Sequence, residues 1–243
     1  MVSGGKPLAV PAAKQGSKRM YLYPMQKYFL IAAVCFSLFS NAQVAVRNEP
    51  RHHNVFENDY IRILDVFIPP RDTTQFHIHN TPSVFTTFTN TATSTQLSGK
   101  EPVRSVSIAG NTWYDSLTTP RIHRVWNDDT SWFHVMDIEF VAAKPHTNPA
   151  SLQSAAIQLF FDEPLANGYH LQLLPDNVIH LPPSAAGYLL LSLGTAAIQY
   201  KQNDYIQHRI MKSGHYLWID AGKSFSLVSD EQIPSSFLLL QLK

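Results

Sequence analysis

The chain has 243 residues and a formal net charge of +1 at pH 7, and its length allows one or two domains. Five of its 19 basic residues and none of its 18 acidic residues lie within the first 42 positions, so the remainder has a net charge of −4. An acidic remainder argues against nucleic acid and against an anionic membrane as partners, because both bind a basic surface.

The N-terminal extension, residues 1–42, ends in the pattern of a secretory signal peptide. Lys27 supplies a basic start, an apolar run covers residues 28–39, and residues 40–42 (SNA) are typical of a cleavage site. The run is shorter than the roughly 20 apolar residues that span a membrane. We expect cleavage before Gln43, export to the periplasm or the medium, and no stable membrane association afterwards; an uncleaved anchor is the alternative. Cleavage removes Cys35, the only cysteine, and with it any disulfide or cysteine catalysis.

From Gln43 onwards the chain has the pattern of β-strands. Short apolar and aromatic runs alternate with clusters of Pro, Gly, Asn and Asp, and residues 60–68 are a clear example. The best helical candidate, residues 151–160, is short. This pattern predicts an all-β fold, a sandwich or a barrel, in which closure hides the strand edges.

Residues 76–80 (FHIHN) carry two histidines two positions apart. Because side chains alternate along a strand, His77 and His79 would lie on one face of it. Such a pair is a weak signal alone, but residues 120–127 (PRIHRVWN) add His123 in another strand-like segment. Three imidazoles can hold a divalent ion and leave a position open for water or substrate. The alternative is that the three histidines line a pocket without metal.

With these histidines, residues 55–140 resemble the cupin superfamily. Its first motif has His-x-His after a Pro-Gly turn and a Glu shortly afterwards, and its second has a His followed by an Asn. Ser83, four positions after His79, stands where the family has Glu, and Arg71 stands where it has the turn Gly. The resemblance implies jelly-roll (double-stranded β-helix) barrels and dioxygenase or isomerase chemistry, which loss of the Glu does not exclude. It also implies a divalent ion (Fe, Mn, Ni, Cu or Zn) on three ligands, His77, His79 and His123.

The second half of the chain repeats the spacing of the first. Residues 123–127 align with 225–229 and continue without a gap, so that Glu139 matches Gln241; residues 84–88 align with 188–192, and Trp113 aligns with Trp218. The repeat predicts two tandem cupin-like barrels, residues 43–145 and 150–243, joined near residues 144–149. Phe225 takes the place of His123 and has no lone pair for a metal, so the second, degenerate barrel should bind no ion.

Two charged residues near the histidines are weak catalytic candidates. Arg121 could hold a carboxylate substrate by a bidentate contact, although an arginine at a strand end is usually solvated. Glu139 could act as an acid or a base, although a structural hydrogen bond is the better interpretation. The remaining histidines, among them His52 and His134, lack a partner spacing and are interpreted as surface or packing residues.

Two functions are compatible with these features. The first is an exported, metal-dependent enzyme that acts on a small molecule. The second is an exported cupin without catalysis that binds a small ligand, such as a sugar or an organic acid, or has a structural role. The open metal position favours the enzyme, whereas the missing Glu and the lack of a clear acid–base pair favour the binding protein. Resemblance at the level of the fold does not decide between them.

Overall fold

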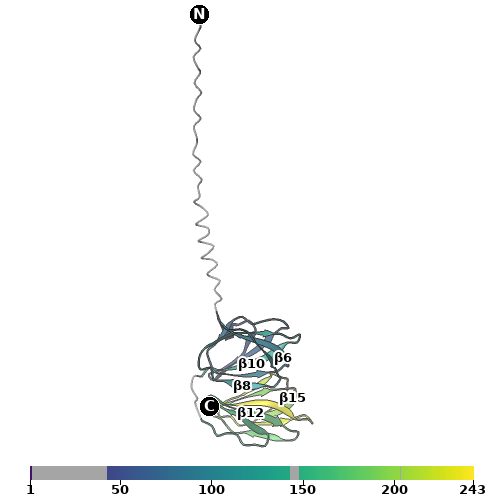
Figure 1. The fold of residues 1–243 in the computed structure, drawn as a ribbon. Helices are drawn as coiled ribbons and strands as arrows, with labels where there is room; N and C mark the ends of the chain where they lie inside the picture. Colours follow the sequence, from purple (N-terminus) through teal and green to yellow (C-terminus); the bar gives the residue numbers. More distant parts are fainter. Residues whose placement is uncertain (2–42, 143–147, 203) are drawn as a thin grey trace. The chain divides into compact units, whose positions relative to one another are not determined.

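The computed structural model describes Met1 and residues 43–142, 148–202 and 204–243 (Figure 1). The chain divides into two units, Met1–Ala42 and Gln43–Lys243, and the strands of the described residues belong to the second. The expected signal peptide, Cys35 and most of the expected linker at 144–149 lie outside the described residues. Within the described ranges, no helix has the length and apolar character needed to cross a membrane.

Residues 43–142 form two five-stranded sheets, and the described part of the chain contains one short 3-10 helix, η1 (Val46–Asn48). The first sheet has the order β1 (Val44–Ala45), β4 (His77–His79), β9 (Arg121–Asn127), β6 (Thr91–Leu97) and β7 (Val103–Ser107). The second has the order β2 (His52–Glu57), β3 (Ile61–Ile68), β10 (Phe133–Phe140), β5 (Ser83–Thr87) and β8 (Thr112–Asp115). Strand β1 pairs with β4 in parallel, and the other pairs are antiparallel.

Residues 148–243 form a five-stranded and a four-stranded sheet. The five-stranded sheet has the order β11 (Ile157–Asp162), β12 (Ala166–Leu173), β19 (Ser235–Leu242), β14 (Tyr188–Ser192) and β17 (Tyr216–Ile219). The other has the order β13 (Val178–Leu181), β18 (Phe225–Ser229), β15 (Ala196–Gln202) and β16 (Tyr205–Met211). The all-β prediction is confirmed. The helical candidate at 151–160 is wrong, because the end of that segment pairs as β11 with β12.

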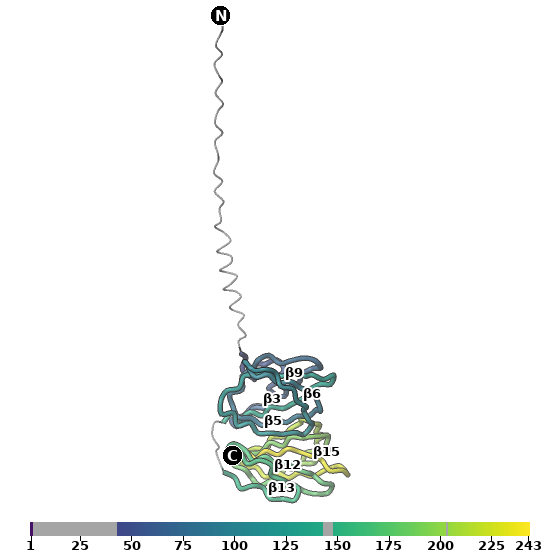
Figure 2. Tube along the Cα trace, viewed as in Figure 1, coloured from purple at the N-terminus to yellow at the C-terminus, as the bar shows by residue number. Residues whose placement is uncertain are grey.

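The strand orders of the two halves repeat each other. The trace shows β3, β5, β6 and β9 grouped together and β12, β13 and β15 in a second group (Figure 2). Strands β10 and β19 have eight residues each, and Glu139 and Gln241 occupy the same position within them. Each pairs with a residue of the neighbouring strand: Glu139 with Ser83 on β5, and Gln241 with Tyr188 on β14. The two jelly-roll layers of each half therefore follow one plan.

This pairing corrects part of the expected alignment by one residue. Tyr188 is equivalent to Ser83 and not to Val84, because each pairs with the equivalent residue of the adjacent strand. On the next strand, Trp113 pairs with Phe85 and corresponds to Leu217, which pairs with Leu190, so Trp113 does not match Trp218. The error came from matching tryptophans, whereas the shared feature is a turn glycine with positive φ, Gly110 at 84° and Gly214 at 83°.

A shared apolar core joins the two halves. Val84 and Ile138 from the first half belong to one buried cluster with Leu189 and Leu240 from the second. All four are 0% exposed. Burying an aliphatic side chain of this size contributes about 1.5–3 kcal/mol to stability, so this cluster contributes substantially to folding. Each half has a further cluster of its own between its two sheets, and the first half also encloses a cavity.

Candidate metal centre

Two neighbouring antiparallel strands bring the three predicted histidines together. His77 and His79 lie on β4, and His123 lies on β9 directly opposite His77. The side chains of His77 and His79 are buried, at 1% and 2% exposure, while Ile78 between them is partly exposed on the other face. The alternation of a strand therefore points both imidazoles into the interior, as the sequence predicted.

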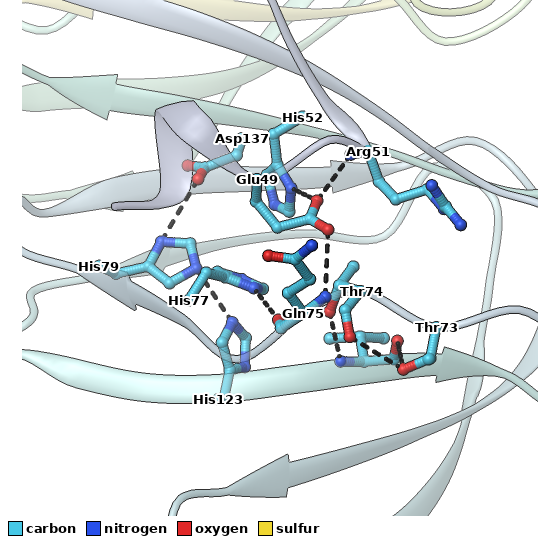
Figure 3. Close-up of polar contacts among 11 residues, drawn as sticks. Glu49, Arg51, His52, Thr73, Thr74, Gln75, His77, His79, His123 and Asp137 are labelled. Carbon is cyan, nitrogen blue, oxygen red and sulfur yellow. Dashed lines mark hydrogen bonds and ion pairs between the residues drawn. The ribbon is translucent and has the colours of Figure 1, made fainter. Parts of the chain in front are cut away.

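The three imidazoles form one compact cluster. One ring nitrogen from each lies within 4.8 Å of the others, and the Nε2 atoms of His79 and His123 are 3.0 Å apart. The ring centroids of His77 lie 5.0 Å from His79 and 4.6 Å from His123. It is the one cluster of metal-binding groups found among the described residues. Figure 3 shows the three rings converging from the two strands.

The outer nitrogen of His77 has a hydrogen-bond partner, which fixes the orientation of its inner nitrogen. The Nδ1 atom of His77 lies 2.9 Å from the carbonyl oxygen of Gln75, and Nδ1 of His79 lies 3.4 Å from Asp137 Oδ2 (Figure 3). The Nε2 atom of His77 and the Nδ1 atom of His79 are buried, and neither has a hydrogen-bond partner among the described residues. Metal-bound histidines in proteins are typically held through their other nitrogen in this way. An unpartnered buried nitrogen in a cluster of three therefore fits a divalent ion.

Burial also sets the charge of the cluster. It lowers the pKa of His77 to about 4, and the pKa of His79 and of His123 falls even further, with the neighbouring histidines adding to the effect. The rings are therefore neutral near pH 7, the form that binds a metal. Burial and the nearby charge of Glu139 raise the pKa of Asp137 well above its ordinary value. A cation on the histidines would favour the carboxylate form of Asp137, because opposite charges stabilise each other.

The cluster lies at the wall of a cavity of about 450 Å³ between the two sheets of the first half. This volume is in the range of small-molecule sites, which is about 300–1,000 Å³. Trp113 and Phe85 stack at a centroid distance of 5.2 Å along one wall. The lining is mainly apolar with several hydroxyl groups, and includes Val66, Ile68, Thr74, Phe85, Thr87, Thr93, Thr95, Trp113, Val125, Phe133 and Val135.

The two weak catalytic candidates lie in different places. Arg121 lines the cavity, opposite His79 in the strand pairing, and its guanidinium forms an ion pair with Asp115. Glu139 is buried and is not among the residues that line this cavity. Its carboxylate accepts hydrogen bonds from Arg62 at 2.9 Å and from Thr81 at 3.1 Å. These contacts hold Glu139 between Arg62 and Thr81.

The two departures from the cupin motif also have structural positions. Ser83 is buried on β5 opposite Glu139. Arg71 has a φ of 63°, in the left-handed region that favours glycine. The turn that precedes β4 therefore keeps the backbone shape of a Pro-Gly turn without the glycine.

Sequence reasoning missed three residues of the site. They are Asp137, Glu49 and His52, the last of which the sequence analysis interpreted as a surface or packing residue. His52 in fact lines the cavity, and its ring centroid lies 4.7 Å from that of His77. Glu49 is buried behind it and contacts its Nδ1 atom at 2.6 Å. No local spacing predicts them, because they lie in segments that are far in sequence from the histidine motif: Glu49 after η1, His52 on β2 and Asp137 on β10.

The second half replaces this polar cluster by apolar residues. Leu181 pairs with Phe225 as His77 pairs with His123, and Pro182 and Pro183 follow Leu181 where Ile78 and His79 follow His77. At the start of β11, Ile157 occupies the position of His52, and on β19 Leu239 occupies that of Asp137. Four of these residues belong to one buried core, namely Ile157, Leu181, Phe225 and Leu239.

Comparisons with known proteins agree with this architecture. No family model matches the chain, and no curated protein sequence matches it. Among solved structures, salicylate 1,2-dioxygenase from Pseudaminobacter salicylatoxidans is similar with a TM-score of 0.58 at 10% identity, over 89% of this chain and 82% of that one. A cupin 2 conserved barrel domain protein from Leptotrichia buccalis has a TM-score of 0.52 at 10% identity, over 79% and 88% of the two chains. AerE from Microcystis aeruginosa has a TM-score of 0.53 at 8% identity, over 80% and 98%. The chain has the cupin fold.

Proposed function

We propose that this chain is a metal-dependent cupin enzyme that acts on a small molecule, of the dioxygenase or isomerase class. The observation that carries the proposal is the unpartnered, buried Nε2 atom of His77 within a cluster of three neutral imidazoles. His77, His79 and His123 would hold one divalent ion, and nitrogen ligands of this kind suit Fe, Mn, Ni, Cu or Zn. A divalent ion held by three imidazoles keeps open positions at which it can polarise a bound oxygen atom.

The chain's own residues determine what such a site can take. Gln75 orients His77 through its outer nitrogen, and the carboxyl group of Asp137 lies 3.4 Å from the outer nitrogen of His79. Among the described residues no carboxylate belongs to the cluster itself, so an ion on the three neutral imidazoles would keep its positive charge and favour a negatively charged atom of the bound molecule as a further ligand. Phe85, Val135 and the other apolar residues of the wall exclude water from the remainder of the ligand.

The first test is the metal content and affinity of the mature protein, purified without a histidine tag. We expect one ion per chain in the wild type. His77→Ala, His79→Ala and His123→Ala should each weaken binding by more than the roughly 10–100-fold that is typical of changes behind the ligands.

His134→Ala is the matched control for these variants. His134 contacts Asp65 at 2.7 Å and stacks on Phe67, away from the cluster, so its loss should leave the metal affinity unchanged. A wild type that takes up no ion under several loading conditions would replace the metal proposal by the pocket alternative.

A second candidate is a cupin that binds a small ligand without catalysis. Two contacts favour this function: Arg121 forms an ion pair with Asp115, and Glu139 accepts a hydrogen bond from Arg62. Neither side chain is therefore free to act as an acid or a base. Oxygen uptake by the metal-loaded protein separates the two. Salicylate and gentisate are reasonable first substrates, because structures similar to this one include a salicylate 1,2-dioxygenase and its adducts with gentisate. Binding in the cavity without turnover across a broad panel would favour the second candidate.

We also propose that the protein is exported and that its mature chain begins at Gln43. The support is the sequence pattern of residues 25–42, and the first strand begins at Val44. Intact mass or N-terminal sequencing of protein from its native host should show that residues 1–42 are missing. A mature protein that retains residues 25–42 would indicate an anchored protein instead.

A further inference from the structure

The segment between the expected cleavage site and β2 forms one side of the metal centre. Strand β1 pairs in parallel with the histidine strand β4, with Val44 opposite His77. Val46 in η1 is buried in the core of the first half. The equivalent sheet of the second half has four strands and, in the part of the chain that the structure describes, no counterpart of β1. The segment therefore adds a strand, β1, and a 3-10 helix, η1, to the barrel plan that the two halves share.

Glu49 is the anchor of this segment. Its carboxylate accepts hydrogen bonds from the backbone N–H of Arg51 at 2.7 Å and of Gln75 at 3.1 Å, and it contacts Nδ1 of His52 at 2.6 Å (Figure 3). The carbonyl of the same Gln75 holds Nδ1 of His77. One buried carboxylate and the backbone of one residue, Gln75, thus link the ring of His52 to the ring of a predicted metal ligand.

These contacts determine which nitrogen of His52 is free. Burial by itself would raise the pKa of Glu49, but the hydrogen bonds from His52, Gln75 and Arg51 outweigh it, and the pKa is lower than usual. Glu49 is therefore a carboxylate, which only accepts, so Nδ1 of His52 donates to it. In the neutral ring the lone pair then lies on Nε2, for which the structure shows no hydrogen bond within the described ranges.

His52 lies beside the three-histidine cluster and not within it. Its ring centroid is 4.7 Å from that of His77 but 6.5 Å from that of His79, and its nitrogens are not part of the compact set. The residue lines the cavity. Its position suits contact with a molecule bound at the cluster better than it suits direct contact with the ion.

We propose that His52 is the hydrogen-bond acceptor of this site, and that it selects ligands with a hydroxyl or N–H group next to their metal-binding atoms. The inference rests on the proposed metal centre and adds the class of ligand. Glu49 is a positioning residue that acts through His52. The apolar cavity would enclose the rest of the ligand.

A matched pair of probes tests this on the zinc-loaded full-length mature protein. Benzohydroxamic acid and N-methylbenzohydroxamic acid offer a metal the same two oxygen atoms, but only the first carries an N–H donor. Calorimetry should show that the wild type prefers the first by about 3–10-fold, the net value of one hydrogen bond. His52→Ala should lose this preference and keep its zinc affinity. Glu49→Gln should also reduce the preference for benzohydroxamic acid, because the amide no longer fixes which nitrogen of His52 is protonated.

His53→Ala is the matched control, because His53 is the neighbouring histidine and is exposed. It should keep both the zinc affinity and the preference. A His52→Ala variant that keeps the preference would overturn the inference and leave the metal centre intact. Loss of zinc from His52→Ala would also overturn it, by showing that His52 is a ligand. Absence of zinc from the wild type would instead overturn the proposed function on which the inference rests.

Discussion

At the scale of single residues, the site combines groups that are costly to bury. His77, His79 and Asp137 are almost completely buried, and neither oxygen of Asp137 has a well-formed hydrogen bond among the described residues. Buried polar groups without partners cost about 1–3 kcal/mol each. Without an ion, therefore, the cluster should reduce the stability of the fold. Binding of a cation would offset that cost, because it supplies the missing partner to the Nε2 atom of His77.

This cost should appear as a dependence of stability on pH in protein kept free of metal by a chelator. The pKa of His77 is about 4 in the fold against an ordinary value of 6.5, and burial lowers that of His123 as well. As the pH falls below about 6.5, the unfolded chain takes up protons that the folded chain cannot, so the free energy of unfolding decreases. Asp137 acts in the opposite direction, because its raised pKa favours the fold at lower pH.

Replacement of one histidine measures its contribution to this pH dependence of stability. Urea denaturation gives the free energy of unfolding at about pH 7 and at about pH 5. The loss of this free energy between the two pH values should be smaller in His123→Leu than in the wild type, by on the order of 1–2 kcal/mol. His53→Leu, at an exposed position, should keep the wild-type difference. Equal differences in all three proteins would mean that His123 is not buried as a neutral ring.

At the scale of elements, the turn at residues 69–72 lies between β3 and the histidine strand β4. The backbone N–H of Asp72 donates to the carbonyl of Pro69 at 3.1 Å, and Arg71 within this turn has a φ of 63°. A residue with a side chain pays roughly 1–2 kcal/mol for this conformation, whereas glycine adopts it readily. The chain thus keeps a strained residue at the corner that leads into the metal centre.

Arg71→Gly should relieve this strain. We expect the free energy of unfolding to rise by up to about 1 kcal/mol, since glycine loses more backbone entropy on folding and offsets part of the gain. Arg71→Ala keeps the strained backbone and removes only an exposed side chain, so chemical denaturation should show no such rise. A stabilisation that is equal in both variants would point to the charge of Arg71 as the cause.

At the scale of the whole molecule, one barrel plan serves two different interiors. The first half encloses the polar cluster and the cavity, whereas the second half fills the equivalent positions with Ile157, Leu181, Phe225 and Leu239. The two halves share a further apolar cluster that includes Leu189 and Leu240. The second half therefore supports the first through packing.

The chain should accordingly bind one ion and not two. Leucine and phenylalanine have no lone pair for a metal, and the two prolines after Leu181 distort the strand that would present ligands. Elemental analysis should give one ion per chain, and anomalous scattering should place it beside His77 and His123. A second ion near His180 would show that the equivalence of the two halves is misassigned around β13.

The sequence by itself determined the features that depend on local period and spacing. Alternation along residues 60–68 and 76–80 predicted the strands and the inward face shared by His77 and His79, because the period of a strand is fixed by its backbone. The spacing from His123 to Asn127 and the repeat to residues 225–229 indicated tandem barrels and a second interior without His123. Only the tertiary structure placed Glu49, His52 and Asp137 around the cluster and moved Glu139 away from it. Those positions depend on which strands lie next to each other across the barrel, and that pairing is set by long-range packing that no local pattern encodes.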